Sequence, residues 1–302
     1  MTQKPLTHEA IACFFGQHMK KKNDGMNKLR EYVVVSYLNK NIPLEWFSDS
    51  KWQHLANQIN GFITTMVPEC DNPDMISAAL AAGRSNHYDF DIWFTRKTGT
   101  RERYCVEFKY GTNSVKGCPQ FVSPMKPSQF FANTEEGFER FYYNNHLSKV
   151  ILDKKTMPTF EQYNKDVHSV SPSCLHKEQL KYYAGCSRSS KFTNDPNDIE
   201  YYELCKQVSS QAIQEFILQT DIDLPAMNEY LRQSQEHKVY MLCDHDGNIN
   251  IETHCQDDYT IHSIKSKTKN SWVALTYSGK EITILLRWKN GNGVAFPALQ
   301  IS

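Results

Sequence analysis

The sequence predicts an α/β protein with a mixed central β-sheet flanked by helices and a strand-rich C-terminal part. Three observations lead to this fold class. Apolar residues recur at helical spacing before residue 66, two alternating strand patterns occupy residues 86–111, and strand patterns with short turns follow residue 238. We expect a single domain over residues 1–302, with a core at about 26–150, a helical middle at about 151–237 and the strand-rich part at about 238–302.

Residues 86–111 predict a β-hairpin that carries charged groups on one face. Asp89 and Asp91 alternate with apolar residues on the first strand, and Glu107 and Lys109 do so on the second. A glycine and small polar residues between the strands are typical of a hairpin turn. Folding about this turn brings Asp89 or Asp91 opposite Glu107, which places two carboxylates and a lysine in one patch.

The other elements follow from the spacing of apolar residues and from turn signals. Further strand pairs are expected at 239–243 with 249–251, and at 272–277 with 282–288, each around a glycine-containing turn. Residues 154–196 show no clear pattern. Helices are expected at 26–39, 52–65, 75–82, 201–219 and 227–234, with partly helical segments at 128–131 and 137–147.

The overall composition favours a soluble intracellular protein of the cytoplasm or nucleus. Lys plus Arg and Asp plus Glu both number 34, so the chain has no global positive field. The nine scattered cysteines favour free thiols. The N-terminal residues lack a signal-peptide pattern, and no apolar run approaches the roughly 20 residues that a membrane span needs. We therefore expect no membrane partner.

The predicted hairpin patch suits the chemistry of phosphodiester hydrolysis. Two carboxylates can hold Mg²⁺ through oxygen ligands and leave positions for water and phosphate. The metal offsets negative charge and lowers the pKa of a bound water, and a lysine beside it can orient that water or stabilise the transition state. A structural hairpin with an exposed charged face is the alternative interpretation.

This pattern resembles the PD-(D/E)xK nuclease superfamily, which includes restriction endonucleases, resolvases and repair nucleases. Glu107 and Lys109 match the second acid and the lysine of the motif, and either Asp89 or Asp91 matches the first acid. The proline that precedes the first acid in the family is replaced here by a tyrosine or a phenylalanine. The resemblance covers residues 86–111 and a preceding helix.

The resemblance implies a restriction-endonuclease-like core that cuts double-stranded DNA with Mg²⁺, for which Mn²⁺ can substitute. The metal ligands would be Asp89 or Asp91 together with Glu107, and Glu31 on the predicted helix at 26–39 would complete the site, with Glu69 as a weaker alternative. The products would carry 5′-phosphate and 3′-hydroxyl ends. A repair or recombination nuclease and a non-catalytic nucleic-acid-binding protein are the alternative functions, and a homodimer is one assembly that the sequence leaves open.

Polar residues after Lys109 are candidates for contacts with DNA. Asn113, Ser114 and Lys116 can hydrogen-bond phosphates or base edges, although a solvated loop explains most such residues equally well. Two cysteine–histidine groups are weaker candidates for zinc, because neither has paired C-x₂-C spacing. These groups are Cys174, His176 and Cys186, and Cys243, His245, His254 and Cys255.

Overall fold

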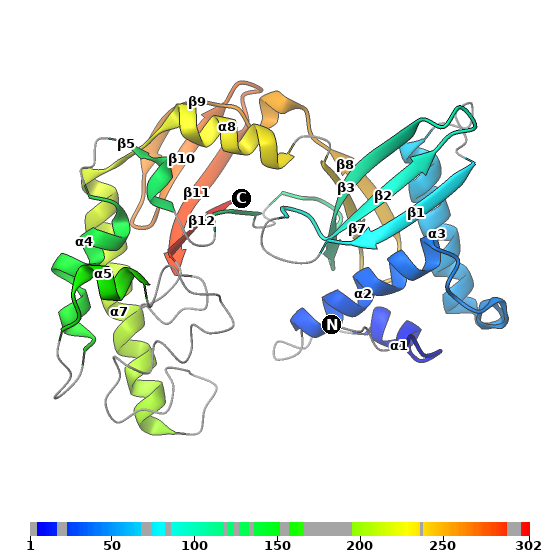
Figure 1. Ribbon diagram of the computed structural model, residues 1–302, viewed down its shortest axis with the longest axis horizontal. Coiled ribbons are helices and arrows are strands. Elements are labelled where there is room, and N and C mark those ends of the chain that lie inside the picture. The colour runs from blue at the N-terminus through cyan, green and yellow to red at the C-terminus, as the bar shows by residue number, and fades with distance from the viewer. Residues whose placement is uncertain are drawn as a thin grey trace. The chain divides into compact units, whose positions relative to one another are not determined.

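The chain folds into two compact units in the computed structural model (Figure 1). Unit 1 comprises Met1–Cys118 and Gln235–Cys255, and unit 2 comprises Pro119–Ser234 and Gln256–Ser302. The structure describes residues 5–16, 23–67, 74–81, 86–116, 120–123, 127–132, 136–151, 157–165, 195–235, 238–288 and 297–302.

Unit 1 is built on a five-stranded mixed sheet in the order β1-β2-β3-β7-β8. Neighbouring strands are antiparallel except β3 and β7, which run parallel. A segment distant in sequence therefore completes the sheet beside the β2–β3 hairpin. The strands are β1 (Met75–Leu80), β2 (Phe90–Thr95), β3 (Arg101–Tyr110), β7 (Lys238–Cys243) and β8 (Ile249–Thr253).

Helices cover one face of this sheet (Figure 1). They are α1 (Ala10–Phe14), α2 (Asn23–Leu38), the 3₁₀ helix η1 (Leu44–Ser48) and α3 (Ser50–Met66). Asp49 starts α3 by accepting a 2.7 Å hydrogen bond from the backbone N–H of Lys51. The alternating apolar residues of β2, β3 and β7 pack against these helices, which confirms the expected alternation of faces. Buried members include Val33, Val34, Trp52, Ile59, Phe90, Ile92, Val106 and Met241.

Residues 75–82 were expected to form an alanine-rich helix, and this prediction is wrong. The segment forms β1, which pairs antiparallel with β2 from Met75 opposite Thr95 to Leu80 opposite Phe90. The side-chain amide of Asn39 donates to the carbonyl of Ala78 and accepts from its N–H, both at 2.8 Å. The backbone ladder with β2 on one side of β1, and the Asn39 side chain on Ala78, therefore outweigh the modest helix preference of alanine.

Unit 2 contains a second five-stranded sheet, in the order β4-β12-β11-β10-β9, with helices packed on it. Aromatic side chains dominate its core, where Phe131, Phe138, Phe216 and Trp272 are buried together. The strands are β4 (Gln120–Ser123), β9 (Ile261–Lys267), β10 (Ser271–Thr276), β11 (Glu281–Trp288) and β12 (Pro297–Ile301), with a small β5–β6 pair (Phe131–Ala132, Asp221–Ile222).

The helices of unit 2 agree with the sequence pattern where one was evident. The predicted helices at 201–219 and 227–234 are α7 and α8, both longer at the N-terminal end than expected. The elements are η3 (Pro127–Phe130), α4 (Phe138–Asn145), η4 (Leu147–Lys149), α5 (Phe160–Tyr163), α7 (Pro196–Gln219), α8 (Leu224–Gln235) and η7 (Gln256–Asp258). In the described part of the chain, we find no helix with the length and apolar character needed to cross a bilayer.

Two glycines fix the ends of β3. Gly99, in the turn between β2 and β3, has φ +81°, and its N–H donates to the carbonyl of Arg96 at 2.8 Å. Gly111, directly after β3, has φ +75°, and its N–H donates to the carbonyl of Cys243 at 2.7 Å. A Cβ at Gly111 would lie 2.8 Å from Cε1 of His245. Only glycine therefore fits this position without strain.

We expect Gly111→Ala to lower the free energy of unfolding by about 1–3 kcal/mol, because alanine would be strained at positive φ and would press on His245. Gly61→Ala is the matched control. Gly61 lies within α3 with open space around its Cα, so alanine should raise stability by about 0.5–1 kcal/mol. Urea denaturation measures both. Equal effects of the two substitutions would contradict this account of Gly111.

Candidate active site

The β2–β3 hairpin brings Asp89 beside Glu107. The ladder begins with Phe90 opposite Val106, and the N–H of Asp89, directly before it, donates to the carbonyl of Val106 at 2.9 Å. One carboxylate oxygen of Asp89 accepts a 2.8 Å hydrogen bond from the N–H of Phe108. Phe90, Val106 and Phe108 are buried in the helix-covered core. The acids therefore lie on the opposite face of the sheet.

Glu107 lies between two lysines, one for each of its carboxylate oxygens. Lys109 Nζ is 2.6 Å from Oε1, and Lys238 Nζ is 2.9 Å from Oε2. The Lys238 side chain is only 4% exposed, against 20% for Lys109. Lys238 is the first residue of β7, and the parallel register sets it opposite Cys105. Sequence reasoning missed this lysine, because a strand pattern does not reveal which strand will be its neighbour.

The electrostatics of the patch distinguish the two acids. Burial raises the pKa of Asp89 to about 6, and the negative charge of Glu107 acts in the same direction. Burial also opposes ionisation of Glu107, but the ammonium groups of Lys238 and Lys109 outweigh it and lower the pKa of Glu107. Burial lowers the pKa of Lys238, and Glu107 counteracts this effect. Asp89 is thus the acid whose negative charge is least compensated.

Asp91 lies in a separate ion pair further along the hairpin. It is opposite Cys105, and Arg103 reaches both of its carboxylate oxygens, through Nε at 2.7 Å and Nη2 at 3.2 Å. The Tyr88 hydroxyl is 3.5 Å from Oδ2 of Asp91. The structure therefore brings Asp89, Glu107 and Lys109 together and gives Asp91 a different partner.

The remaining candidate ligands do not enlarge this group. Glu31 is half-buried on α2. Among the residues that the structure describes, no three His, Cys, Asp or Glu side chains form a group able to hold a metal ion. This statement covers Glu31 with the two acids, and it covers the cysteine–histidine group at 243–255. Glu69 and the group at 174–186 lie outside the described residues.

Asp89 and Glu107 nevertheless form a donor set that fits Mg²⁺. Mg²⁺ is commonly bound by one or two protein carboxylates, with water and substrate phosphate as its other ligands. The raised pKa of Asp89 reflects the burial of its charge and the nearby negative charge of Glu107, and a bound cation would offset both effects. The carboxylate oxygens of both residues are hard donors of the kind that Mg²⁺ prefers.

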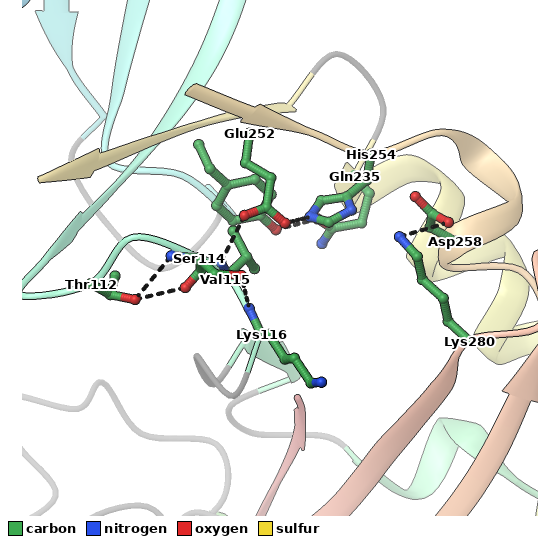
Figure 2. A network of polar contacts seen from close by, with 10 residues as sticks. Thr112, Ser114, Val115, Lys116, Gln235, Glu252, His254, Asp258 and Lys280 are labelled. Carbon is green, nitrogen blue, oxygen red and sulfur yellow. Dashed lines mark hydrogen bonds and ion pairs between the residues drawn. The ribbon is translucent and has the colours of Figure 1, made fainter. Parts of the chain in front are cut away.

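The loop after β3 is tied to the sheet by Glu252 (Figure 2). The N–H of Val115 donates to Oε2 of Glu252 at 2.9 Å, and Nε2 of His254 lies 3.1 Å from Oε1. Glu252 is opposite Tyr240, which is in turn opposite Glu107, so a row across β8, β7 and β3 links the loop to the site.

The three residues predicted to contact DNA belong to this tied loop. Asn113, Ser114 and Lys116 are all exposed. The loop is braced internally by Thr112, whose hydroxyl donates to the carbonyl of Ser114 at 2.7 Å. Val115 is buried between them and packs with Tyr240 and Leu242. The loop therefore holds its polar side chains outward from a fixed backbone.

Comparisons with known proteins give one structural similarity. A crystal structure of the restriction endonuclease MspI in complex with its cognate DNA aligns over 97% of this chain and 97% of that chain, with a TM-score of 0.39 and 10% sequence identity. No protein-family model and no curated protein sequence matches the chain. The α/β fold class is shown by the structure itself, with its mixed sheet, its flanking helices and its strand-rich C-terminal part.

We expect Asp89→Asn to stabilise the metal-free protein at pH 8. The folded-state pKa of Asp89 is raised from 3.8 to about 6, so its ionised form costs stability above pH 6 and this cost is absent near pH 4. The gain should be on the order of 1–3 kcal/mol at pH 8 and should vanish as the pH falls towards 4. Urea denaturation in EDTA at both pH values measures it.

Asp91→Asn is the control, because it removes the ion pair with Arg103 and should lower stability at pH 8. A gain at pH 8 for Asp91→Asn, or none for Asp89→Asn, would contradict the electrostatic description of the two acids.

Proposed function

We propose that the protein is a Mg²⁺-dependent endonuclease that hydrolyses phosphodiester bonds in double-stranded DNA, in the manner of a type II restriction enzyme. One observation carries the proposal: Asp89, Glu107 and Lys109 converge on one face of two adjacent strands, with Lys109 Nζ 2.6 Å from Glu107. The resemblance of the hairpin to the PD-(D/E)xK motif supports it. The geometry favours Asp89 over Asp91 as the first acid, since Asp91 is engaged by Arg103.

In this proposal, each residue of the patch has a distinct role. Asp89 and Glu107 would hold Mg²⁺, with Mn²⁺ as a substitute. The metal would offset negative charge at the phosphate and lower the pKa of a bound water. The N–H of Phe108 fixes the orientation of the Asp89 carboxylate. Lys109 is positioned by Glu107 and would stabilise charge that develops on the phosphate oxygens.

The loop tied by Glu252 is proposed to engage DNA beside the reacting phosphate. Lys116 would contact the backbone, and Asn113 and Ser114 would contact phosphate or base edges. All three follow Lys109 closely in the sequence, and the loop backbone is held by the hydrogen bond from Val115 to Glu252. A homodimer would supply two such sites, one for each strand of the duplex.

We expect Glu107→Ala and Lys109→Ala to abolish Mg²⁺-dependent cleavage of plasmid DNA, with a loss of at least about 100-fold for Lys109 because charge stabilisation in the transition state is removed. Glu102→Ala is the matched control. Glu102 lies on the same strand but pairs with Arg96 near the hairpin turn, so cleavage should persist.

The pattern of cleavage products separates the candidate functions. Discrete bands support a restriction-type enzyme, and smears support a less specific nuclease of the same fold. Activity that is unchanged in both the Glu107→Ala and Lys109→Ala variants would refute the site. DNA binding without cleavage in Mg²⁺ or Mn²⁺ would favour a non-catalytic nucleic-acid-binding protein.

We expect Lys116→Ala to weaken duplex binding uniformly across sequences and to reduce the slope of log affinity against log salt by about 1, because one phosphate contact is lost. The measurement uses fluorescence anisotropy in the cleavage-deficient Lys109→Ala background. Lys97→Ala is the control, since Lys97 is an exposed lysine of the hairpin turn. An unchanged salt slope in Lys116→Ala would remove Lys116 from the interface.

A further inference from the structure

We propose that Lys238 is a positioning residue that holds Oε2 of Glu107, so that only Oε1 of this carboxylate can bind a divalent cation. The inference rests on the proposed function, because it concerns how Glu107 would serve as a metal ligand. Lys238 lies outside the motif, on the strand β7, which is next to β3 in the sheet but far from it in the sequence. Its consequence is a preference of the site for Mg²⁺ over larger cations.

The first step of the argument is the fixed position of Lys238. Its side chain is 4% exposed, and its backbone is held in the parallel ladder opposite Cys105. Nζ lies 2.9 Å from Oε2 of Glu107 and 5.2 Å from the centroid of the Tyr240 ring. A buried ammonium group that leaves its carboxylate would lose its ion pair in a poorly solvated environment. Lys238 is therefore expected to stay on Oε2.

The second step is the difference between the two lysines. Lys109 contacts the other oxygen, Oε1, and its side chain is five times as exposed as that of Lys238 (20% against 4%). Lys109 can therefore exchange its contact with Glu107 for water or an incoming anion at a lower cost in desolvation. Oε1 is thus the oxygen that becomes available to a cation, whereas Oε2 stays occupied.

The third step connects this occupancy to the choice of metal. Mg²⁺ requires near-ideal octahedral geometry and keeps several of its waters. Ca²⁺ accepts six to eight oxygens and readily takes both oxygens of one carboxylate. A glutamate with one oxygen held by a lysine can offer only the other. Lys238 therefore disfavours Ca²⁺ through geometry, in addition to its charge, which repels both cations equally.

The test is the ratio of Ca²⁺ to Mg²⁺ affinity, measured by isothermal titration calorimetry on the full chain without DNA. In Lys238→Met, a neutral side chain of similar length, the ratio should rise by roughly 10-fold or more, as expected when a group that orients a metal ligand is removed. Lys238→Arg retains a donor for Oε2 and should keep the wild-type ratio. Lys109→Met frees only Oε1, so it should change both affinities by a similar factor.

The outcomes separate this inference from the proposed function. If the wild type binds Mg²⁺ and the ratio in Lys238→Met is unchanged, the role of Lys238 is refuted and the metal site stands. If the wild type binds neither cation and does not cleave DNA, the proposed function itself fails. If Lys238→Met does not unfold cooperatively, Lys238→Leu, which also has no donor for Oε2, replaces it with the same expected rise, and an unchanged ratio there refutes the inference equally.

Discussion

The parallel pairing of β3 with β7 is the interaction on which the rest of unit 1 depends. Its register sets Lys238 opposite Cys105 and Tyr240 opposite Glu107. The same pairing brings β8 into the sheet, and with it Glu252, which holds the loop after β3 through the N–H of Val115. The buried lysine beside Glu107 and the anchor of the polar loop thus both follow from one strand contact.

The candidate site concentrates buried charge, which suits the proposed metal binding better than it suits folding. Glu107 has two ammonium partners, so its ionised form is well supported. Asp89, beside it, has a single backbone N–H as its closest donor and carries a raised pKa. Such a carboxylate destabilises the metal-free fold and favours any cation that enters. Stability is given up at the position where the proposed chemistry needs negative charge.

The sequence predicted local features well and long-range ones poorly. Alternation in the hairpin predicted that Glu107 and Lys109 share one face of their strand, because side chains on a strand alternate between faces. The glycine and small polar residues around Gly99 predicted the turn. The same alternation puts Asp89 and Asp91 on one face, so only the register could distinguish them. The strand β1 was mistaken for a helix, since its pairing with β2 is tertiary. Lys238 was missed because the sequence does not state which strand lies beside β3.

Unit 1 is discontinuous, and this has a consequence for the order in which the chain can fold. A chain that emerges from its N-terminus exposes the hairpin with Glu107 and Lys109 well before β7 exists. Until residues 238–253 arrive, β3 is an edge strand with unpaired backbone groups, open to pairing with other chains. Such non-local contacts form slowly. The proposed nuclease site is therefore completed only after residues 238–253 have been synthesised, and a chain that stops short of them lacks the buried lysine beside Glu107.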